Sequence, residues 1–220
     1  MHKVIQNLNE IQNLVKSKLT DLNKIDSVPK IIAVSKTFKM EKILPLIEYG
    51  HLDYGENKVQ EAIDKWNDIK LKNDNIKIHL LGKLQTNKVK LAVKFFDFIH
   101  SLDSEKLAKK ISEEQKKINL KPKIFIQINI GEELQKSGIH HDQLLDFYNY
   151  CRELDLDIIG TMCIPPINDD PREYFSRMEN LNKKYNLKAL SMGMSSDYLK
   201  AIEYNSTYLR IGSNIFGPRD

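Results

Sequence analysis

Apolar residues follow two alternating patterns along the chain, one with the period of a helix and one in short continuous runs. The helical pattern comes first, because apolar side chains recur every three or four residues between positions 4 and 22. After Pro29, the run from Ile31 to Val34 is short, mostly β-branched and bounded by polar residues, which is typical of a strand buried on both faces. The same alternation continues to the end of the chain and predicts a parallel α/β domain.

The pattern predicts eight strands separated by helices. The expected strands are residues 31–34, 51–54, 76–81, 98–102, 123–130, 157–162, 188–191 and 208–211. The expected helices after the leading one are residues 40–49, 58–69, 91–95, 103–118, 141–154, 171–185 and 198–204. Within the first of these, Pro45 should lie in the first turn or kink the helix.

Eight strands, each but the last followed by a helix, predict a single (β/α)8 TIM-type barrel over residues 1–220. The extra N-terminal helix, residues 1–26, is expected to pack on this barrel. An open doubly wound sheet would use the same elements, but it would leave the first and eighth strands far apart. The distribution of candidate site residues favours closure.

Composition and charge narrow the class of protein. The net charge is only +4, and lysines alternate with acidic residues, so we expect solvated helix faces and no nucleic-acid partner. Cys151 and Cys163 lack metal-ligand spacing and are expected to be buried thiols in a reducing compartment. No signal peptide is apparent, and no apolar run approaches the ~18 residues of a membrane span. We therefore expect a cytoplasmic protein with no membrane partner. We also expect a monomer.

The candidate chemistry lies at the carboxyl ends of the strands, where barrels place their ligands. Lys36 follows the first strand, and closure would bring it beside the loops at 191–196 and 210–213. Glycines and hydroxyls in these loops suit a phosphate, and residues 196–197 open a helix whose amino end attracts anions. Gly193 and Gly212 alone would indicate only turns. A lysine beside a phosphate pocket predicts an aldehyde cofactor, pyridoxal phosphate, since a partly desolvated amine can form a Schiff base.

Other polar residues carry alternative interpretations. Arg210 is expected to point into the barrel and donate to the cofactor's ring nitrogen, although a salt bridge inside the barrel is a rival interpretation. His79 would orient Arg210, line the ring, or be a hydrogen-bonded core histidine. Asn57 would contact the cofactor or cap the following helix. The pair His140 and His141 has no carboxylate or cysteine at ligand spacing, so no metal site is expected.

Several short motifs occur in order over nearly the whole chain. They are Ala33-Val-Ser-Lys-Thr37, Gly55-Glu-Asn57, Gly82-x-Leu-Gln-Thr-Asn-Lys88, Lys136-Ser-Gly138, Ser191-Met-Gly-Met-Ser195, and Arg210-Ile-Gly212 followed by Ile215-Phe-Gly217. Together they resemble the pyridoxal phosphate homeostasis proteins (the YggS/PROSC type), whose fold is the barrel domain of bacterial alanine racemases. The third strand departs from the family pattern, because it keeps the histidine but lacks an aromatic residue.

The resemblance implies a set of site residues. Lys36 would carry pyridoxal phosphate as an aldimine, and Arg210 would meet the ring nitrogen. The phosphate would be held by Ser195, Gly212 and Ser213. The expected cofactor site as a whole contains Lys36, Asn57, His79, Ser191, Met194, Ser195, Arg210, Gly212 and Ser213.

The implied function is to bind, store and hand over pyridoxal phosphate in vitamin B6 homeostasis, limiting the free aldehyde, with apo-enzymes as possible acceptors. Lys136, in the loop after the fifth strand, is a candidate for transfer of the cofactor, although an exposed loop lysine is an equal interpretation. A racemase would need a tyrosine from a second domain, and the chain ends at Asp220. The alternatives are a weak racemase or decarboxylase, revealed by turnover, and a cofactor-free Schiff-base aldolase-type barrel, which would be colourless.

Overall fold

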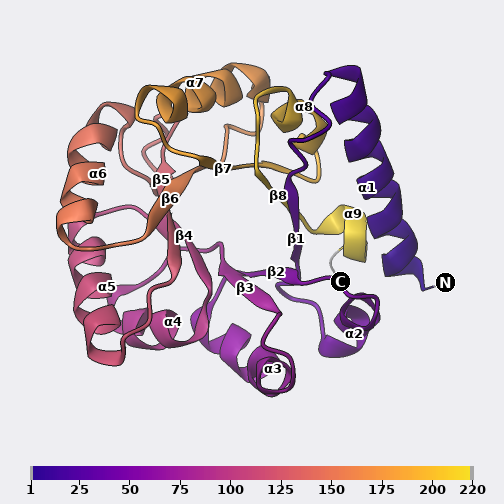
Figure 1. Cartoon of the computed structure of the whole chain (residues 1–220), viewed down its shortest axis with the longest axis horizontal. Helices are drawn as coiled ribbons and strands as arrows, with labels where there is room; N and C mark the ends of the chain where they lie inside the picture. Colours follow the sequence, from indigo (N-terminus) through magenta and orange to yellow (C-terminus); the bar gives the residue numbers. More distant parts are fainter. Residues whose placement is uncertain (1, 219–220) are drawn as a thin grey trace.

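The computed structural model describes residues 2–218 and contains a closed barrel of eight parallel strands surrounded by helices (Figure 1). The strands are β1 (Lys30–Val34), β2 (Asp53–Glu56), β3 (Lys77–Leu80), β4 (Phe98–Leu102), β5 (Lys123–Ile128), β6 (Ile158–Cys163), β7 (Ala189–Met194) and β8 (Tyr208–Ile211). The α-helices are α1 (Lys3–Asp21), α2 (Met40–Glu48), α3 (Val59–Lys72), α4 (Val89–Phe95), α5 (Glu105–Ile118), α6 (Leu144–Glu153), α7 (Pro171–Lys184), α8 (Tyr198–Glu203) and α9 (Ser213–Phe216). Short 3-10 turns η1 (Thr86–Lys88) and η2 (His141–Gln143) precede α4 and α6.

Barrel closure depends on pairing between the first and last strands. β1 runs parallel to β8, with Lys30 opposite Tyr208 and Ala33 opposite Ile211. Each other strand pairs with its neighbour in sequence, so the sheet has no free edge. The expected (β/α)8 barrel is thus confirmed. Closure also places the carboxyl ends of β1, β7 and β8 side by side at one mouth.

Apolar packing occurs in two separate regions. The main core lies between the strands and the surrounding helices, as in other barrels of this kind. A smaller cluster fills part of the barrel interior and contains Phe98, Phe125, Met162 and Ala189. The leading helix α1 packs on the outside against α2, α8 and α9 through an apolar face that includes Leu8 and Val15 (Figure 1).

Several expected element boundaries were wrong. β2 begins at Asp53, two residues later than expected, because Gly50 and His51 complete the end of α2, where the His51 N–H donates to Leu46 O. β7 extends to Met194, beyond the expected end. The last strand is followed by a helix, α9, contrary to expectation. Pro45 lies in the interior of α2, which excludes the first turn and leaves a kink as the other alternative of that expectation. Within residues 2–218, no helix is both long and apolar enough to cross a membrane.

Candidate functional site

Lys36 lies in a tight turn directly after β1. The Ser35 N–H donates to Gly55 O (2.9 Å), which extends the pairing with β2, and the Phe38 N–H then donates back to Ser35 O (3.1 Å). Thr37 adopts a left-handed conformation with φ of 70°, which few residues other than glycine tolerate. The Lys36 side chain is partly buried at the mouth of the barrel. The turn therefore places Lys36 just beyond the carboxyl end of β1.

The carboxylate of Glu56 holds this turn from beneath. Its Oε1 accepts hydrogen bonds from Ser35 Oγ (2.7 Å), Trp66 Nε1 (2.9 Å) and Lys65 Nζ (3.0 Å). The Glu56 side chain is 1% exposed, and a buried carboxylate is tolerable only when it is paired in this way. Lys65 also donates to Ser35 O (3.0 Å). Glu56 and Lys65 position the turn that carries Lys36, and the sequence analysis assigned them no role.

The loops after β7 and β8 meet through a shared oxygen. Ser195 Oγ accepts from the backbone N–H of Gly212 (3.2 Å) and from that of Asn214 (3.5 Å). The Asn214 side chain donates to Ser195 O (2.9 Å), which ties the loops together a second time. Ser213 begins α9 and is exposed at the same place. Gly193 has a φ of 90°, and a Cβ there would lie 2.7 Å from Ala201 Cβ, so this position requires glycine.

Arg210 points into the barrel interior, as expected from strand alternation. It is 5% exposed, and it pairs in register with Met194 of β7. Its NH1 donates to Ser191 Oγ (2.7 Å) and its NH2 donates to Cys163 O (2.8 Å). Burial lowers the pKa of Arg210, but a guanidinium starts so high that it stays protonated. No carboxylate is among these hydrogen-bond partners, in contrast to the alternative of a direct salt bridge.

A continuous chain of hydrogen bonds runs from Arg210 through the barrel interior, and all but the last, at Asp53, are buried. Ser191 Oγ lies 3.0 Å from His100 Nδ1. His100 Nε2 lies 3.0 Å from His79 Nδ1, and His79 Nε2 lies 3.0 Å from Asp53 Oδ1. We refer to Arg210, Ser191, His100, His79 and Asp53 as the interior relay. Its members come from β8, β7, β4, β3 and β2, so it crosses the barrel.

The chemistry of the two ends fixes the direction of donation in the interior relay. Arg210 can only donate and an ionised Asp53 can only accept. Burial lowers the pKa of His79 and of His100 below 6.5, so both are neutral at pH 7, and every group between the two ends then donates toward Asp53, with the proton of each histidine on Nε2. Burial lowers the pKa of His79, and it lowers the pKa of His100 well below its usual value, to which the neighbouring His79 and Arg210 also contribute. Burial alone would raise the pKa of Asp53, but the hydrogen bond from His79 and nearby positive charge lower it.

His79 is therefore a hydrogen-bonded core histidine linked to Arg210 through two other groups. Both of its ring nitrogens are occupied by protein partners, and its ring stacks on Phe98 with centroids 4.2 Å apart. Its orientation of Arg210 is indirect. Sequence analysis did not single out His100 or Asp53, because polar residues within or beside strands gave no spacing signal for a chain of contacts across five strands.

A cavity of about 230 Å³ lies at the mouth of the barrel. It is lined by the expected residues Asn57 and Lys136, and also by Lys83, which was not among the expected residues. Gly82 permits the close approach of the loops after β2 and β3, since a Cβ there would lie 2.2 Å from Asn57 O. Lys136 Nζ donates to Pro165 O (3.1 Å) and forms an ion pair with Glu133. The loop after β5 therefore does bring Lys136 to the mouth.

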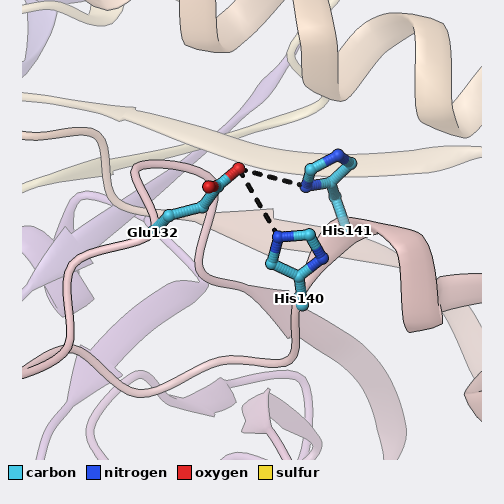
Figure 2. Close-up of side chains that lie close together, drawn as sticks. All are labelled: Glu132, His140 and His141. Carbon is cyan, nitrogen blue, oxygen red and sulfur yellow. Dashed lines mark ion pairs between the residues drawn. The ribbon is translucent and has the colours of Figure 1, made fainter.

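The loop after β5 also contains a cluster that the sequence analysis dismissed. Figure 2 shows the side chains of His140 and His141 turned toward the carboxylate of Glu132, whose Oε1 lies 3.5 Å from a nitrogen of each. The expectation that this pair has no carboxylate partner was wrong, because the loop folds back and brings residue 132 to its own far end. The carboxylate of Asp142 also lies beside both rings.

The fold and the mouth residues define a class of protein, a (β/α)8 barrel of the alanine racemase type. The family profile described as alanine racemase, N-terminal domain, matches residues 5–220. Alanine racemase from Clostridium difficile 630 superposes with a TM-score of 0.74 at 16% identity, over 98% of this chain and 56% of that one, which shows the shared fold alone.

Closer relatives identify the family more narrowly. A pyridoxal phosphate homeostasis protein of Pasteurella multocida is 35% identical over 98% of this chain and 97% of its own. Another from Aquifex aeolicus is 37% identical over 88% of this chain and 89% of its own. PipY of Synechococcus elongatus PCC7942, in its structure with PLP bound, is 31% identical over 92% of this chain and all of its own, with a TM-score of 0.79. The chain belongs to the family of pyridoxal phosphate homeostasis proteins.

Proposed function

We propose that this chain binds pyridoxal 5′-phosphate through Lys36 and serves in its storage and transfer in vitamin B6 homeostasis. The observation that carries the proposal is the position of Lys36 at the mouth of the barrel, beside the loop after β8. Ala33 and Ile211 are opposite each other in the β1–β8 pair, so Lys36 and Gly212 both follow closely from the same point of the sheet. The names of the relatives and the cofactor in PipY support the same ligand.

The residues present suit the three chemical parts of this cofactor. Backbone N–H groups of Gly212 and Asn214 already converge on one oxygen, that of Ser195, as a phosphate oxygen requires. Arg210 supplies guanidinium donors that suit an unprotonated ring nitrogen. When bound, the cofactor supplies an aldehyde that condenses with amines, and Lys36 supplies the amine. Ser191 and Met194 lie on β7, which leads directly into Ser195, Ser213 would add a hydroxyl at the phosphate, and Asn57 faces the same mouth.

The nature of Arg210 favours a carrier role, without a catalytic residue. Carbanion chemistry on this cofactor is helped by a protonated ring nitrogen, and an arginine cannot surrender a proton to it. The interior relay holds Arg210 in place from behind, which keeps this donor fixed. A weak racemase or decarboxylase activity is the alternative, and solvent deuterium incorporation at the α-carbon of an added amino acid would reveal it.

Transfer of the cofactor would use Lys136 and an acceptor apo-enzyme. Lys136 lies on the mouth cavity with Asn57, within a loop closed by its own hydrogen bonds. Replacement by alanine should slow transfer to an apo-enzyme and leave the absorbance of the loaded protein unchanged. An unaltered transfer rate would remove Lys136 from this role. We further propose that the protein acts as a monomer in the cytoplasm.

Reduction of the loaded protein with borohydride tests the site directly. The reduced label should remain on the peptide that contains Lys36, and Lys36→Ala should lose both the label and the yellow colour. Lys39→Ala is the matched control, because this exposed lysine lies in the same connection between β1 and α2. Label recovered mainly on another peptide, or undiminished colour in Lys36→Ala, would contradict the assignment.

A further inference from the structure

Three metal-ligand atoms converge in the loop after β5, the same loop that contains Lys136. Among residues 2–218, Glu132, His140 and His141 each offer a ligand atom, and these atoms lie within 4.8 Å of one another (Figure 2). Glu132 Oε1 is 3.5 Å from His140 Nε2 and 3.5 Å from His141 Nδ1. Ligands of a tetrahedral Zn²⁺ at ~2.0–2.1 Å are separated from each other by about 3.3 Å. The cluster is thus nearly at the spacing of a coordination shell.

The outward nitrogens of both histidines face a second carboxylate. His140 Nδ1 lies 3.4 Å from Asp142 Oδ2, and His141 Nε2 lies 3.3 Å from Asp142 Oδ1. A metal-bound histidine usually donates its other ring N–H to a carboxylate, which fixes the tautomer that binds the ion. Asp142 can accept from both rings at once. The backbone N–H of Asp142 also approaches His140 Nδ1 at 3.4 Å, a long contact that this tautomer would replace.

The inward nitrogen of His141 has no hydrogen-bond partner. Nδ1 of His141 is buried, and its approach to Glu132 does not satisfy the geometry of a hydrogen bond. A buried, unprotonated nitrogen that faces a carboxylate is unfavourable, because two acceptors then lie side by side with no donor. A cation bound between them would interact favourably with both. Glu132 reaches this place from a left-handed backbone conformation, with φ of 55°. Such conformations in residues other than glycine concentrate at functional sites.

We propose that Glu132, His140 and His141 bind a first-row divalent transition metal such as Zn²⁺, with Asp142 orienting both histidines and water completing the coordination. Two imidazole nitrogens and one carboxylate oxygen suit Zn²⁺, Co²⁺, Ni²⁺ or Cu²⁺. Mg²⁺ and Ca²⁺ prefer an all-oxygen shell and should not compete. The Glu132 and His140 side chains are 50% and 43% exposed, so an ion can enter from solvent.

The loop is already closed around the proposed site. The Asn129 N–H donates to Ile139 O (3.0 Å), and the Ile139 N–H donates to Gln127 O (2.9 Å). The Asn129 side chain also bonds the backbone of Glu133 in both directions. These bonds hold the two ends of the loop side by side without any metal. Metal binding therefore costs less conformational entropy. Metal binding would then tighten residues 132–140, the segment that contains Lys136.

One cation competes for the site. Arg177 NH2, on α7, lies 3.4 Å from Glu132 Oε1. Exposed ion pairs of this kind contribute little to stability, so a divalent ion coordinated by three ligands should displace the guanidinium. Removal of the Arg177 charge should therefore strengthen metal binding, a result that nonspecific binding at exposed histidines would not give.

Titration of the purified protein with Zn²⁺ against a chromophoric chelator tests the proposal. One equivalent should bind, and Co²⁺ at the same site should show the d–d absorption of a low-coordinate nitrogen and oxygen shell. Glu132→Gln, His140→Ala and His141→Ala should each weaken Zn²⁺ binding at least about tenfold, and Asp142→Asn by about tenfold. Arg177→Met should bind Zn²⁺ more tightly than the native protein. Zn²⁺ should also slow hydrogen exchange in residues 132–140.

His2→Ala is the control, because His2 is exposed and lies at the other end of the chain. Its Zn²⁺ affinity should equal that of the native protein. Absence of saturable binding of one equivalent would overturn the proposal. Equal affinity in Glu132→Gln, His141→Ala and the native protein would also overturn it, because the ion would then bind elsewhere. Since cofactor loading is not needed for any of these measurements, failure of the cofactor assignment would leave their outcome unchanged.

Discussion

The two neutral histidines of the interior relay should make the fold sensitive to mild acid. His79 and His100 are both fully buried, and their pKa values are lowered by that burial from an ordinary value of 6.5. Protonation of His100 would add a second N–H, directed at Ser191 Oγ, which already accepts from Arg210. The added charge would also face the Arg210 guanidinium. The folded state therefore resists protonation at these sites, while the unfolded chain does not.

The sign and size of the effect follow from this difference. A histidine whose pKa is lower in the folded state makes the unfolded state bind more protons below pH 6.5, so stability falls as the pH falls through that value. Protonation of a histidine of ordinary pKa stabilises the unfolded chain. This stabilisation is about 1.4 kcal/mol larger at pH 5.5 than at pH 7.5. The two together should remove at most about 2.7 kcal/mol from the free energy of unfolding, a limit reached when neither histidine is protonated in the folded state at pH 5.5. Asp53 acts in the same direction only at lower pH, since its pKa is also lowered.

His100→Gln isolates one half of this effect. Glutamine can accept from Ser191 and donate to His79, so it keeps the polarity of the relay without a titratable group. Urea unfolding of the cofactor-free protein at pH 7.5 and 5.5 should show a loss about 1.4 kcal/mol smaller in His100→Gln than in the native protein. His2→Ala, at an exposed site, should retain the native loss. If His100→Gln and the native protein lose equal stability, the histidines are not held neutral and the assigned donor order fails.

Two further predictions concern the packing of the barrel and of the Lys36 turn. Gly160→Ala should destabilise the barrel by about 3 kcal/mol, because the new Cβ would lie 1.7 Å from Ala189 O in the neighbouring strand. Gly50→Ala is the control: the new Cβ would have no atom within 4 Å, so the substitution should cost only about 1 kcal/mol for its left-handed backbone. Equal shifts in Tm for the two variants would refute this difference. Glu56→Ala should cost about 3 kcal/mol, since it leaves Lys65 and Trp66 without their buried acceptor, and it should weaken cofactor binding by releasing the Lys36 turn. Unchanged cofactor affinity in Glu56→Ala would show that this carboxylate stabilises the fold without positioning Lys36.

The architecture was predictable because each strand of a parallel barrel carries the same local signal. A short β-branched run between helical segments identifies a strand such as β1, and eight repeats of that pattern imply closure. The same rule places Lys36 at the mouth, since ligands bind at the carboxyl ends of strands. The main boundary errors fell where this signal fails. β2 contains the buried charge of Glu56, and β7 continues through Gly193, and neither residue type predicts a strand.

The contacts that position the site were not predictable, because they join residues with no fixed spacing in sequence. The hydrogen bond between His100 and Ser191 spans 91 residues, and that between Glu56 and Ser35 spans 21. The Glu132 cluster was missed for a different reason. Its ligands are close in sequence, but only the folded loop turns the carboxylate of Glu132 back toward His140 and His141. Periodicity determines which face of an element is buried, but it does not determine which polar groups meet across a barrel.

The interior relay is a consequence of placing a guanidinium inside a barrel. A buried charge is costly unless its donors are satisfied, and Arg210 satisfies two of them with Ser191 and Cys163 O. Ser191 then needs an acceptor for its own proton, and His100 supplies it. His100 donates in turn to His79, and His79 donates to the carboxylate of Asp53, which only accepts. Replacing any middle member with an apolar residue would leave its two hydrogen-bond partners unsatisfied. Arg210 and the polar residues of the barrel interior therefore cannot be substituted independently of one another. The polar interior thus belongs to the site as much as to the core.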